Sequence, residues 1–417
     1  MPITRNSTAR TGRRPRSGGG RGRTAALAAL TVLTLLTALA PAQAGAAGAG
    51  TTAGDRTPVP ADALQRDADA IRDAGVTGVA VRLETPAGVR TVRSGVGNLR
   101  TGTPVPRDGH LRIGSTTKTY VATVLLQLVG EGRLSLDDTV ERWLPGVVRG
   151  NGNDGRRITL RHLLQHTSGL PEYVQDVVPD LSPAGYRKHR WTTYTAGQRV
   201  AFAMTHRPSF APGTGWEYSN TNYVLAGLVV EAVTGRSWDR EVHTRILRPL
   251  GLRHTVTPGT DPSMPRPHAR NYQQFEPAEP MTDTTLAYLP FDGDADGSVI
   301  ATAADTNRFF AALLGGRLLA PGQLAELKRT MALPDRPGHV PGERDGLGIF
   351  WTPLTCGGGY WGHSGSSFGT LVLPATTADG RTSVTVSAHS RPGDEDTAVR
   401  QLRGITDLVD HALCAAR

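Results

Sequence analysis

The stretch STTKTYVATVLLQL, residues 115–128, is the most informative part of the chain. Its apolar residues recur at helical spacing, with Val121 and Leu125 on one face, so we predict a largely buried helix. Ser115 and Lys118 lie three residues apart on that helix, so the hydroxyl and the amine can touch. A serine needs a base to become a nucleophile, and a lysine serves as one only when burial lowers its pKa. The alternative is an ordinary helix start with a solvated lysine.

Two further short motifs carry groups that can do chemistry. The sequence Tyr-Ser-Asn at 218–220 lies between a Pro/Gly-containing loop and a predicted helix, and the alternative is that it merely caps this helix. The sequence His-Ser-Gly at 363–365 follows a run of glycines and precedes a predicted strand. Its alternative is a turn with an exposed histidine. Neither motif alone decides between chemistry and local structure.

The order of predicted elements indicates a sheet built from both ends of the chain. Helices are expected at 60–74, 115–128, 158–165, 223–233, 305–314 and 397–413, and strands at 76–83, 89–96, 370–373 and 384–388. Strands therefore come from the two ends, and the middle, roughly residues 125–295, is mostly helical. This pattern predicts an α/β (α+β) fold, with an antiparallel sheet flanked by helices and a helical insertion subdomain.

Composition limits the classes of protein to which the chain can belong. Of its 417 residues, 38% are hydrophobic and 20% are charged, which favours a folded chain over a disordered one. The formal net charge is +9, but seven arginines and no acid fall within residues 1–44, which leaves +2 for the rest. A dedicated nucleic-acid-binding protein is therefore not indicated.

The N-terminus has the pattern of an export signal. A basic region ends at Arg23, an apolar stretch covers residues 24–40, and the small-x-small pattern Ala-Gln-Ala follows at 42–44. We expect a signal peptide over residues 1–44, a flexible lead-in over 45–59 and one domain over 60–417. The alternative is an uncleaved membrane anchor, for which the apolar stretch is short. After cleavage the protein would be secreted, with no stable membrane span.

Export also bears on the two cysteines, because a pair outside the cytoplasm can form a disulfide and keep it. Cys356 and Cys414 both lie late in the chain, and no third cysteine competes. Two unrelated buried thiols are the alternative. Two cysteines are too few for a disulfide-rich miniprotein or a four-cysteine zinc site.

Together, the three motifs resemble those of the penicillin-recognising serine hydrolases. Ser-x-x-Lys, Tyr-x-Asn and His/Lys-Ser/Thr-Gly, in this order, match the branch of serine-type D-Ala-D-Ala carboxypeptidases, class C β-lactamases and related esterases. The segments 127–134, 166–170 and 218–227 resemble other common stretches of that branch. The resemblance covers essentially all of residues 60–415 and implies a β-lactamase/transpeptidase-like fold.

The resemblance implies a role for each motif residue. Ser115 is the acylated nucleophile, and Lys118 and Tyr218 form the proton-transfer pair. The positions expected to bind substrate are Asn220, which hydrogen-bonds a substrate amide, and His363, Ser364, Gly365 and Ser366. The main-chain N–H groups of Ser115 and Ser366 form the oxyanion hole. Some exported members carry a disulfide that agrees with Cys356–Cys414, and neither a cofactor nor a metal is implied.

Several positions depart from the family pattern. Histidine replaces the usual lysine at position 363, which leaves the charge there at pH 7 open. Ser364 and Ser366 stand where threonines are common, so the hydroxyls are kept. Phe350 occupies a position where some carboxypeptidases carry an arginine for the substrate's terminal carboxylate, and Arg344 is a candidate replacement. This departure puts D-Ala-D-Ala specificity in doubt.

Other patterns predict less. Residues 365–369 match G-x-S-x-G with Ser367 as the serine, but a strand is expected to follow, not the helix that an α/β-hydrolase requires. His162 and His166 lie four residues apart without an obvious third ligand, so we expect structural histidines. The acidic loop at 292–296 superficially resembles a calcium loop but lacks the terminal glutamate.

We therefore expect a secreted, cofactor-free serine acyl hydrolase of the D-alanyl-D-alanine carboxypeptidase type, acting through an acyl-enzyme on peptidoglycan-like peptides. The alternatives are an esterase or a β-lactamase of the same fold, or, from another class, a catalytically idle protein that binds wall peptides. The intact set of Ser115, Lys118, Tyr218 and Asn220 argues against the idle protein. The expected partner is a small peptide, ester or β-lactam substrate, with no nucleic acid, and the expected state is a monomer.

Overall fold

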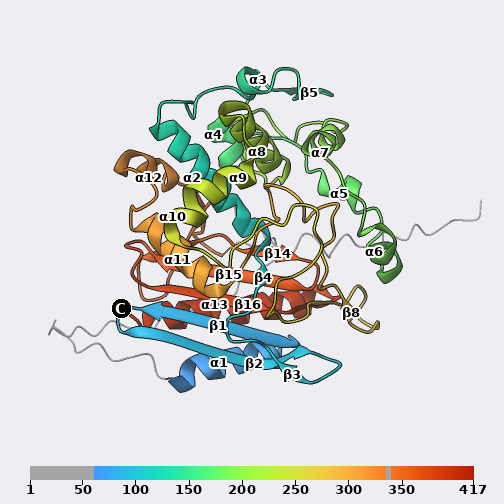
Figure 1. Cartoon of the computed structure of the whole chain (residues 1–417), viewed down its shortest axis with the longest axis vertical. Helices are drawn as coiled ribbons and strands as arrows, with labels where there is room; N and C mark the ends of the chain where they lie inside the picture. The colour runs from blue at the N-terminus through green and yellow to red at the C-terminus, as the bar shows by residue number, and fades with distance from the viewer. Residues whose placement is uncertain (1–60, 335–339) are drawn as a thin grey trace, which may run out of the picture.

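The computed structural model describes residues 61–334 and 340–417. A large antiparallel sheet separates a thin layer of helices from a much larger helical part (Figure 1). This architecture confirms the predicted fold class. The expected signal peptide and lead-in lie outside the described residues. In the described part of the chain, no helix is both long and apolar enough to cross a bilayer.

The sheet has ten strands, and early strands pair with late ones. In spatial order the strands are β10 (Met331–Ala332), β11 (Arg344–Asp345), β12 (Phe350–Pro353), β13 (Gly359–Gly362), β15 (Thr370–Thr377), β16 (Ser383–Ala388), β1 (Gly78–Thr85), β2 (Gly88–Asn98) and β3 (Thr103–Pro104), and β14 (Gly365–Ser367) pairs with β15. β1 lies beside β16, with Val81 opposite Val386. The sheet is therefore assembled from both ends of the chain, as the sequence predicts.

Two helices cover one face of the sheet. α1 (Ala61–Asp73) and α13 (Glu395–Cys414) pack on each other, and α1 lies beneath β1 and β2 in Figure 1. Ile71, Val386 and Leu408 belong to the same buried cluster, which lies between these helices and the sheet. Burial of this continuous apolar layer fixes the register, because a one-residue slip would turn the apolar side chains of β16 to its other face.

The other face carries α11 (Ala303–Leu314) and the helical part, which share a second buried core. The remaining helices are α2 (Thr117–Gly130), α3 (Val140–Trp143), α4 (Leu160–Leu164), α5 (Val174–Val177), α6 (Pro183–His189), α7 (Ala196–Ala203), α8 (Thr221–Thr234), α9 (Trp238–Val242), α10 (Arg248–Leu250) and α12 (Pro321–Leu327), with the 3-10 turn η1 (Gly114–Thr116) and the π-helical turn η2 (His243–Leu247). The short strands are β4 (Leu111–Arg112), β5 (Arg149–Gly150), β6 (Asn153–Asp154), β7 (Tyr272–Gln273), β8 (Thr282–Asp283), β9 (Ile300–Ala301) and β17 (Ser390–Arg391). α2 packs against α8, which confirms that the stretch following Ser115 forms a buried helix.

One strand is longer than its sequence predicts. We expected it to cover residues 370–373, whereas β15 continues to Thr377. Pro374 lies opposite Thr385 within the ladder that β15 forms with β16. Proline lacks an N–H donor and usually marks a strand's edge or end. Here β15 continues beyond Pro374 because its residues on both sides of the proline pair with β16.

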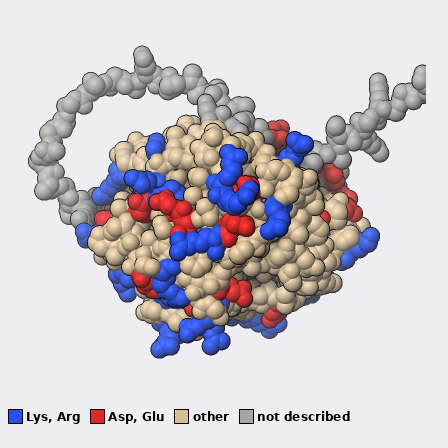
Figure 2. Space-filling model, turned by 90° about the horizontal axis from the view of Figure 1, so that it is seen from above, with Lys and Arg blue, Asp and Glu red and all other residues tan. Residues whose placement is uncertain are grey.

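Charged side chains of both signs are mixed on one face of the molecule. On the face shown in Figure 2, Lys and Arg side chains alternate with Asp and Glu side chains, and neither sign forms a continuous field. This distribution agrees with the small net charge that remains outside residues 1–44.

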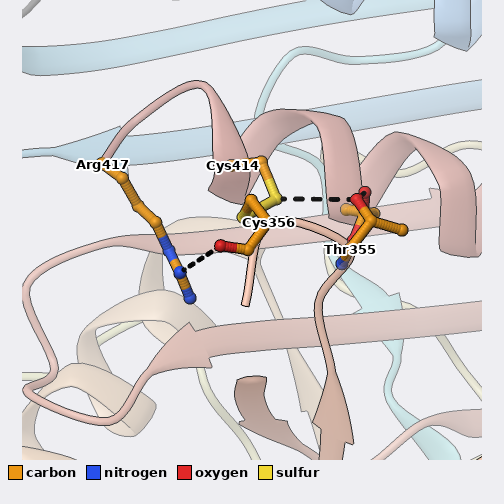
Figure 3. The surroundings of a disulfide bond; sticks show 5 residues. Thr355, Cys356, Cys414 and Arg417 are labelled. Atoms are coloured by element: carbon orange, nitrogen blue, oxygen red, sulfur yellow. Dashed lines mark hydrogen bonds between the residues drawn. A yellow bond between two sulfur atoms is a disulfide. The ribbon is translucent and has the colours of Figure 1, made fainter. Parts of the chain in front are cut away.

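A disulfide joins Cys356, in the turn between β12 and β13, to Cys414 at the end of α13 (Figure 3). Further hydrogen bonds hold the same turn, and one of them runs from the Thr355 hydroxyl to Asp410 Oδ2. The main-chain N–H of Thr355 donates to Asp410 Oδ1 at 2.8 Å, and Arg417 Nη1 donates to the main-chain oxygen of Cys356 at 3.2 Å. The expected pairing is therefore present, and it fastens α13 to the turn that joins β12 and β13.

We predict that replacing both cysteines, Cys356→Ser with Cys414→Ser, lowers stability without preventing folding. The bond closes a loop of 58 residues, and in the chain-entropy model such a link contributes about 4 kcal/mol. Thermal unfolding of the oxidised wild type and the double variant measures the loss. Equal melting temperatures would show that the Thr355 and Arg417 contacts are sufficient alone.

Candidate active site

Ser115 lies in a tight turn whose backbone is fixed on both sides. It occupies η1, directly before α2, and Gly114 has a φ of +48°, in the left-handed region that glycine adopts most easily. Thr116 Oγ1 donates to the main-chain oxygen of His363 at 2.7 Å, which ties the turn to the third motif. Ser115 is half-buried, whereas both neighbours are buried. Ser115 is therefore the partly exposed residue of a turn that is otherwise buried.

Strand β14 approaches this turn so closely that side chains are excluded at two positions. A Cβ on Gly114 would lie 2.6 Å from the main-chain oxygen of Ser366 and 2.7 Å from its nitrogen. A Cβ on Gly365 would lie 1.8 Å from the main-chain oxygen of Ile113 and 3.0 Å from the nitrogen of Ser115. The two glycines thus bring the backbones of Ser115 and Ser366 together, as an oxyanion hole made of main-chain N–H groups requires.

Lys118 reaches Ser115 from the first turn of α2. Its side chain is fully buried, and its Nζ lies 3.0 Å from Ser115 Oγ, 2.7 Å from Asn220 Oδ1 and 2.6 Å from the main-chain oxygen of Asp296. Burial lowers the pKa of Lys118 to about 8, although the carboxylates of Asp296 and Glu172 act to raise it. About half of the amine is therefore neutral near pH 8.

The three contacts of Lys118 also fix the direction of its lone pair. A protonated amine donates three hydrogen bonds, whereas a neutral amine donates two and keeps one lone pair. Asn220 Oδ1 and the Asp296 carbonyl can only accept, so they take both N–H groups of the neutral amine. The lone pair then points to the remaining partner, Ser115 Oγ. This is the geometry by which a base removes the hydroxyl proton.

Tyr218 lies beside the amine, and its ring is held from another side by His166. Lys118 Nζ is 5.0 Å from the centroid of the Tyr218 ring, and the His166 ring stacks on it at 4.2 Å between centroids. Burial raises the pKa of Tyr218 well above its ordinary value, and a hydrogen bond with Ser115 offsets this only in part. Tyr218 is therefore a protonated phenol at neutral pH.

His166 and His162 have separate structural roles, as the sequence predicts. His166 Nδ1 accepts from the main-chain N–H of Ser219 at 3.2 Å and from Asn222 Nδ2 at 3.1 Å, which holds the loop before α8. Burial lowers the pKa of His166 well below its ordinary value. His162 instead completes a capping box at the start of α4.

Glu172 is a site residue that the sequence motifs did not reveal. Its Oε2 accepts from the main-chain N–H of Asn220 at 2.8 Å and from Asn220 Nδ2 at 2.9 Å, and its Oε1 accepts from the N–H of Val174 at 3.0 Å. These bonds turn the amide oxygen of Asn220 toward Lys118. Burial raises the pKa of Glu172, and the N–H groups of Asn220 and Val174 oppose this effect. The only sequence signal for Glu172 was its place just after the segment 166–170.

His363 is uncharged, which answers the question that the sequence left open. Its Nδ1 lies 2.7 Å from the main-chain oxygen of Ser364, so this nitrogen carries the hydrogen. Burial, together with the nearby charge of Lys118, lowers the pKa of His363 to about 3. Phe350 packs edge-to-face on the imidazole, with 5.0 Å between centroids. Together, Phe350 and His363 form a wall of the site without a charge.

Arg344 does not replace the arginine that this wall lacks. In the β11–β12 pair, Arg344 lies opposite Trp351, and Asp345 lies opposite Phe350. Opposite residues share a face of the sheet and successive residues alternate, so Arg344 and Phe350 point to different faces. Arg344 Nε donates to Thr330 Oγ1 at 2.7 Å. The suggestion that Arg344 binds a substrate carboxylate is therefore wrong, because the strand register turns its side chain away.

The serine of the G-x-S-x-G pattern is buried and already paired. Ser367 is 8% exposed, and its Oγ donates to Asp292 at 2.8 and 2.9 Å from the two carboxylate oxygens. β14 is followed by β15 and not by a helix, so the chain forms no nucleophile elbow here.

The sequence model of the beta-lactamase family matches residues 61–406. The chain belongs to this family. Penicillin-binding protein 4 of Amycolatopsis lactamdurans is 30% identical over 321 residues, which cover 74% of this chain and 81% of the relative. The D-alanyl-D-alanine-carboxypeptidase/endopeptidase AmpH of Escherichia coli K12 is 28% identical over 302 residues, 70% of this chain and 73% of AmpH.

Two solved structures extend the comparison. A D-stereospecific amidohydrolase from Streptomyces sp. is 40% identical, with a TM-score of 0.74 over 81% of this chain and 97% of that one. A D-amino acid amidase from Ochrobactrum anthropi SV3 is 28% identical, with a TM-score of 0.72 over 85% of this chain and 97% of that one. The comparisons confirm the expected family resemblance, fold and enzyme class: the chain is a serine hydrolase of the β-lactamase/penicillin-binding fold.

We predict that a fluorophosphonate, which reacts with activated serines, labels Ser115 and not Ser367. The lone pair of Lys118 faces Ser115 Oγ, whereas Ser367 Oγ is buried against Asp292. Ser115→Ala should lose the label, and Ser367→Ala should still be labelled at Ser115. Mass spectrometry of the labelled peptide locates the adduct. An adduct on Ser367 would revive the α/β-hydrolase interpretation.

Proposed function

We propose that the protein is an amidohydrolase that forms an acyl-enzyme and cleaves amides and peptides of D-amino acids, including those whose leaving group has no free carboxylate. The observation that carries the proposal is the uncharged wall of Phe350 and His363. A carboxylate buried against this wall would lose hydration without gaining a charged partner there. Similarity to the D-stereospecific amidohydrolase supports the D-amino acid part of the proposal.

In the proposed mechanism, acylation begins at Ser115. Neutral Lys118 accepts the hydroxyl proton while Ser115 Oγ bonds to the substrate's carbonyl carbon. The carbonyl oxygen becomes negatively charged, and the main-chain N–H groups of Ser115 and Ser366 stabilise it. Lys118 now carries a proton and is an ammonium group.

The ammonium then supplies the acid that the leaving group needs. The C–N bond breaks, and the leaving nitrogen takes one proton, either from Lys118 directly or from Tyr218, which regains a proton from Lys118. The base role goes to Lys118 because its pKa is near 8, whereas burial keeps the Tyr218 phenol protonated. In deacylation, water attacks the acyl carbon while Lys118 takes its proton. The C–O bond to Ser115 then breaks, and Lys118 returns the proton to Ser115 Oγ as the acid is released.

The residues that we assign to substrate binding surround this reaction centre. They are Asn220, His363, Ser364, Gly365 and Ser366. Asn220 Nδ2 gives one hydrogen to Glu172 and keeps the other for an acceptor on the substrate. Ser364 and Ser366 are half-buried, so their polar groups remain within reach of a bound ligand.

We also propose that this chemistry takes place outside the cell. The export pattern at residues 1–44 supports this location. Peptidoglycan-like peptides would be the D-amino acid substrates met there. A monomer remains the sequence-based prediction.

A strict D-alanyl-D-alanine carboxypeptidase is the second candidate. It is favoured by similarity to AmpH and to penicillin-binding protein 4. An esterase is a third candidate, but Esterase EstB of Burkholderia gladioli matches over only 41% of its length, at 36% identity. The two candidates differ in the leaving group that they prefer. A carboxypeptidase prefers a leaving group with a free carboxylate, whereas the proposed amidohydrolase also accepts one without it.

We predict that the acylation rate rises with pH through about 8, because acylation needs neutral Lys118 and deprotonation produces it. Lys118→Arg keeps the charge but cannot lose its proton, so it should cut acylation by about a thousandfold. Tyr218→Phe should mainly slow leaving-group protonation and deacylation. Pre-steady-state acylation rates across pH measure both effects. Tolerance of arginine together with a crippling Tyr218→Phe would make Tyr218 the base instead.

We predict that wild type accepts the C-terminal amide of a D-Ala-D-Ala peptide at least as well as the free acid. Phe350→Arg adds a cation to the uncharged wall and should shift the ratio of kcat/KM toward the free acid by about tenfold. Phe350→Met is the matched control, since it changes shape without charge. A strong preference of wild type for the free acid would favour the carboxypeptidase candidate.

A further inference from the structure

Only the Asp296 carbonyl of the acidic loop at 292–296 has a role in the proposed mechanism, yet the loop contacts two sides of the site. Its three aspartates are buried: Asp292 is 3% exposed, Asp294 8% and Asp296 1%. The described residues include no cluster of three or more acidic, histidine or cysteine side chains placed to hold a metal ion. Each aspartate instead pairs with a different protein group.

The first aspartate holds the strand that carries Ser366. Both oxygens of Asp292 accept from Ser367 Oγ, and Oδ2 also accepts from the main-chain N–H of Tyr288 at 2.9 Å. Burial raises the pKa of Asp292, and the positive charge of Arg112 opposes this effect most strongly. Ser367 is the neighbour of Ser366 in β14, so the hydrogen bonds to Asp292 fix the segment that contains the Ser366 N–H.

The last aspartate holds Lys118. The main-chain oxygen of Asp296 accepts from Lys118 Nζ at 2.6 Å, while its side-chain Oδ2 accepts from the hydroxyl of Tyr173 at 2.8 Å. Directly after the loop, the main-chain N–H of Val299 donates to Thr117 Oγ1 at 3.1 Å. Two hydrogen bonds therefore fix the position of the Asp296 carbonyl: the bond between the Asp296 side chain and Tyr173, and the bond between Val299 and the start of α2.

We propose that the loop at 292–296 is a positioning element that sets the oxyanion strand through Asp292 and both the place and the charge surroundings of the Lys118 amine through Asp296. This inference rests on the proposed function, because it assigns roles around the same reaction. The Asp292 carboxylate and the Asp296 carbonyl belong to the same five-residue segment. This segment therefore fixes the distance between the backbone of Ser366 and the amine of Lys118.

The two ends of the loop act by different physical means. Asp296 affects the basicity of Lys118, because its carboxylate raises the pKa of the amine. Asp292 affects only where an N–H group lies, because it acts through Ser367. Asp294 does neither: its Oδ1 accepts from the main-chain N–H of Ala295 at 2.7 Å and its Oδ2 lies 3.8 Å from Arg199 Nη1. Asp294 is thus a control within the same loop.

The first experiment measures the pH dependence of fluorophosphonate acylation in Asp296→Asn. Removal of the carboxylate should move the acidic limb of the rate profile to lower pH by roughly half a unit or more, because the amine then loses its proton more readily. Asp294→Asn removes a charge from the same loop and should leave the limb in place. Thermal unfolding confirms that both variants are folded before their profiles are compared.

The second experiment tests the Asp292 end through Ser367. Ser367→Ala should lower the acylation rate constant at saturating reagent about ten- to a hundredfold, with little change in the half-saturating concentration and none in the acidic limb. Ser367→Thr keeps the hydroxyl and should restore most of the rate. If Ser367 has a purely structural role, the acylation rates of the Ser367→Ala and Ser367→Thr variants should instead fall in proportion to their loss of melting temperature.

The outcomes separate this inference from the proposed function. An unmoved limb in Asp296→Asn, an equal shift in Asp294→Asn, or a wild-type rate in Ser367→Ala would overturn the positioning role while leaving the serine chemistry intact. Failure of wild type to be labelled at Ser115 would contradict the proposed function and the inference together. A shifted limb with Asp296→Asn and a hydroxyl-dependent rate at Ser367 would establish the two ends of the element.

Discussion

The placement of one buried amine constrains the rest of the molecule. Lys118 lies between the hydroxyl of Ser115 in the turn before its own helix, the side chain of Asn220 before α8 and the main-chain oxygen of Asp296. The last two groups lie 102 and 178 residues away in the sequence. Because a buried amine without partners costs much free energy, all three contacts must form together. The packing of α2 against α8 and the contact of Val299 with the start of α2 therefore serve the site as well as the core.

Opposing influences give the amine and its neighbouring phenol different protonation states. Burial lowers the pKa of Lys118, and the carboxylates of Asp296 and Glu172 limit that fall to a value of about 8. A much lower pKa would supply more neutral amine but a weaker base, and a general base works best when its pKa lies near the working pH. The same burial raises the pKa of Tyr218, which stays an acid. In the proposed mechanism, one apolar environment would thus supply a base and a proton donor side by side.

The sequence predicts what local spacing controls and misses what tertiary contacts control. The spacing of three predicted that Ser115 and Lys118 lie close together, and the strand patterns at both ends of the chain predicted β1, β2, β15 and β16 of the ten-stranded sheet. Glu172 belongs to no recognised motif, and Asp292 was noted only as part of an acidic loop. Only folding brings these two carboxylates to Asn220 and Ser367. The direction of Arg344 depends on strand register, which a two-residue strand does not reveal in the sequence.

The histidine at position 363 links the strength of the base to the charge of the substrate. A lysine there would place a second ammonium near Lys118, and like charges lower each other's pKa. Because His363 is neutral, no such repulsion acts, and the charged form of Lys118 is favoured only by carboxylates of the protein itself, Asp296 and Glu172. A lysine would also attract a substrate carboxylate, which in turn would offset the added positive charge. In the proposed mechanism, the carboxylates of Asp296 and Glu172 supply the negative charge that balances Lys118, so acylation would not need a substrate that brings one.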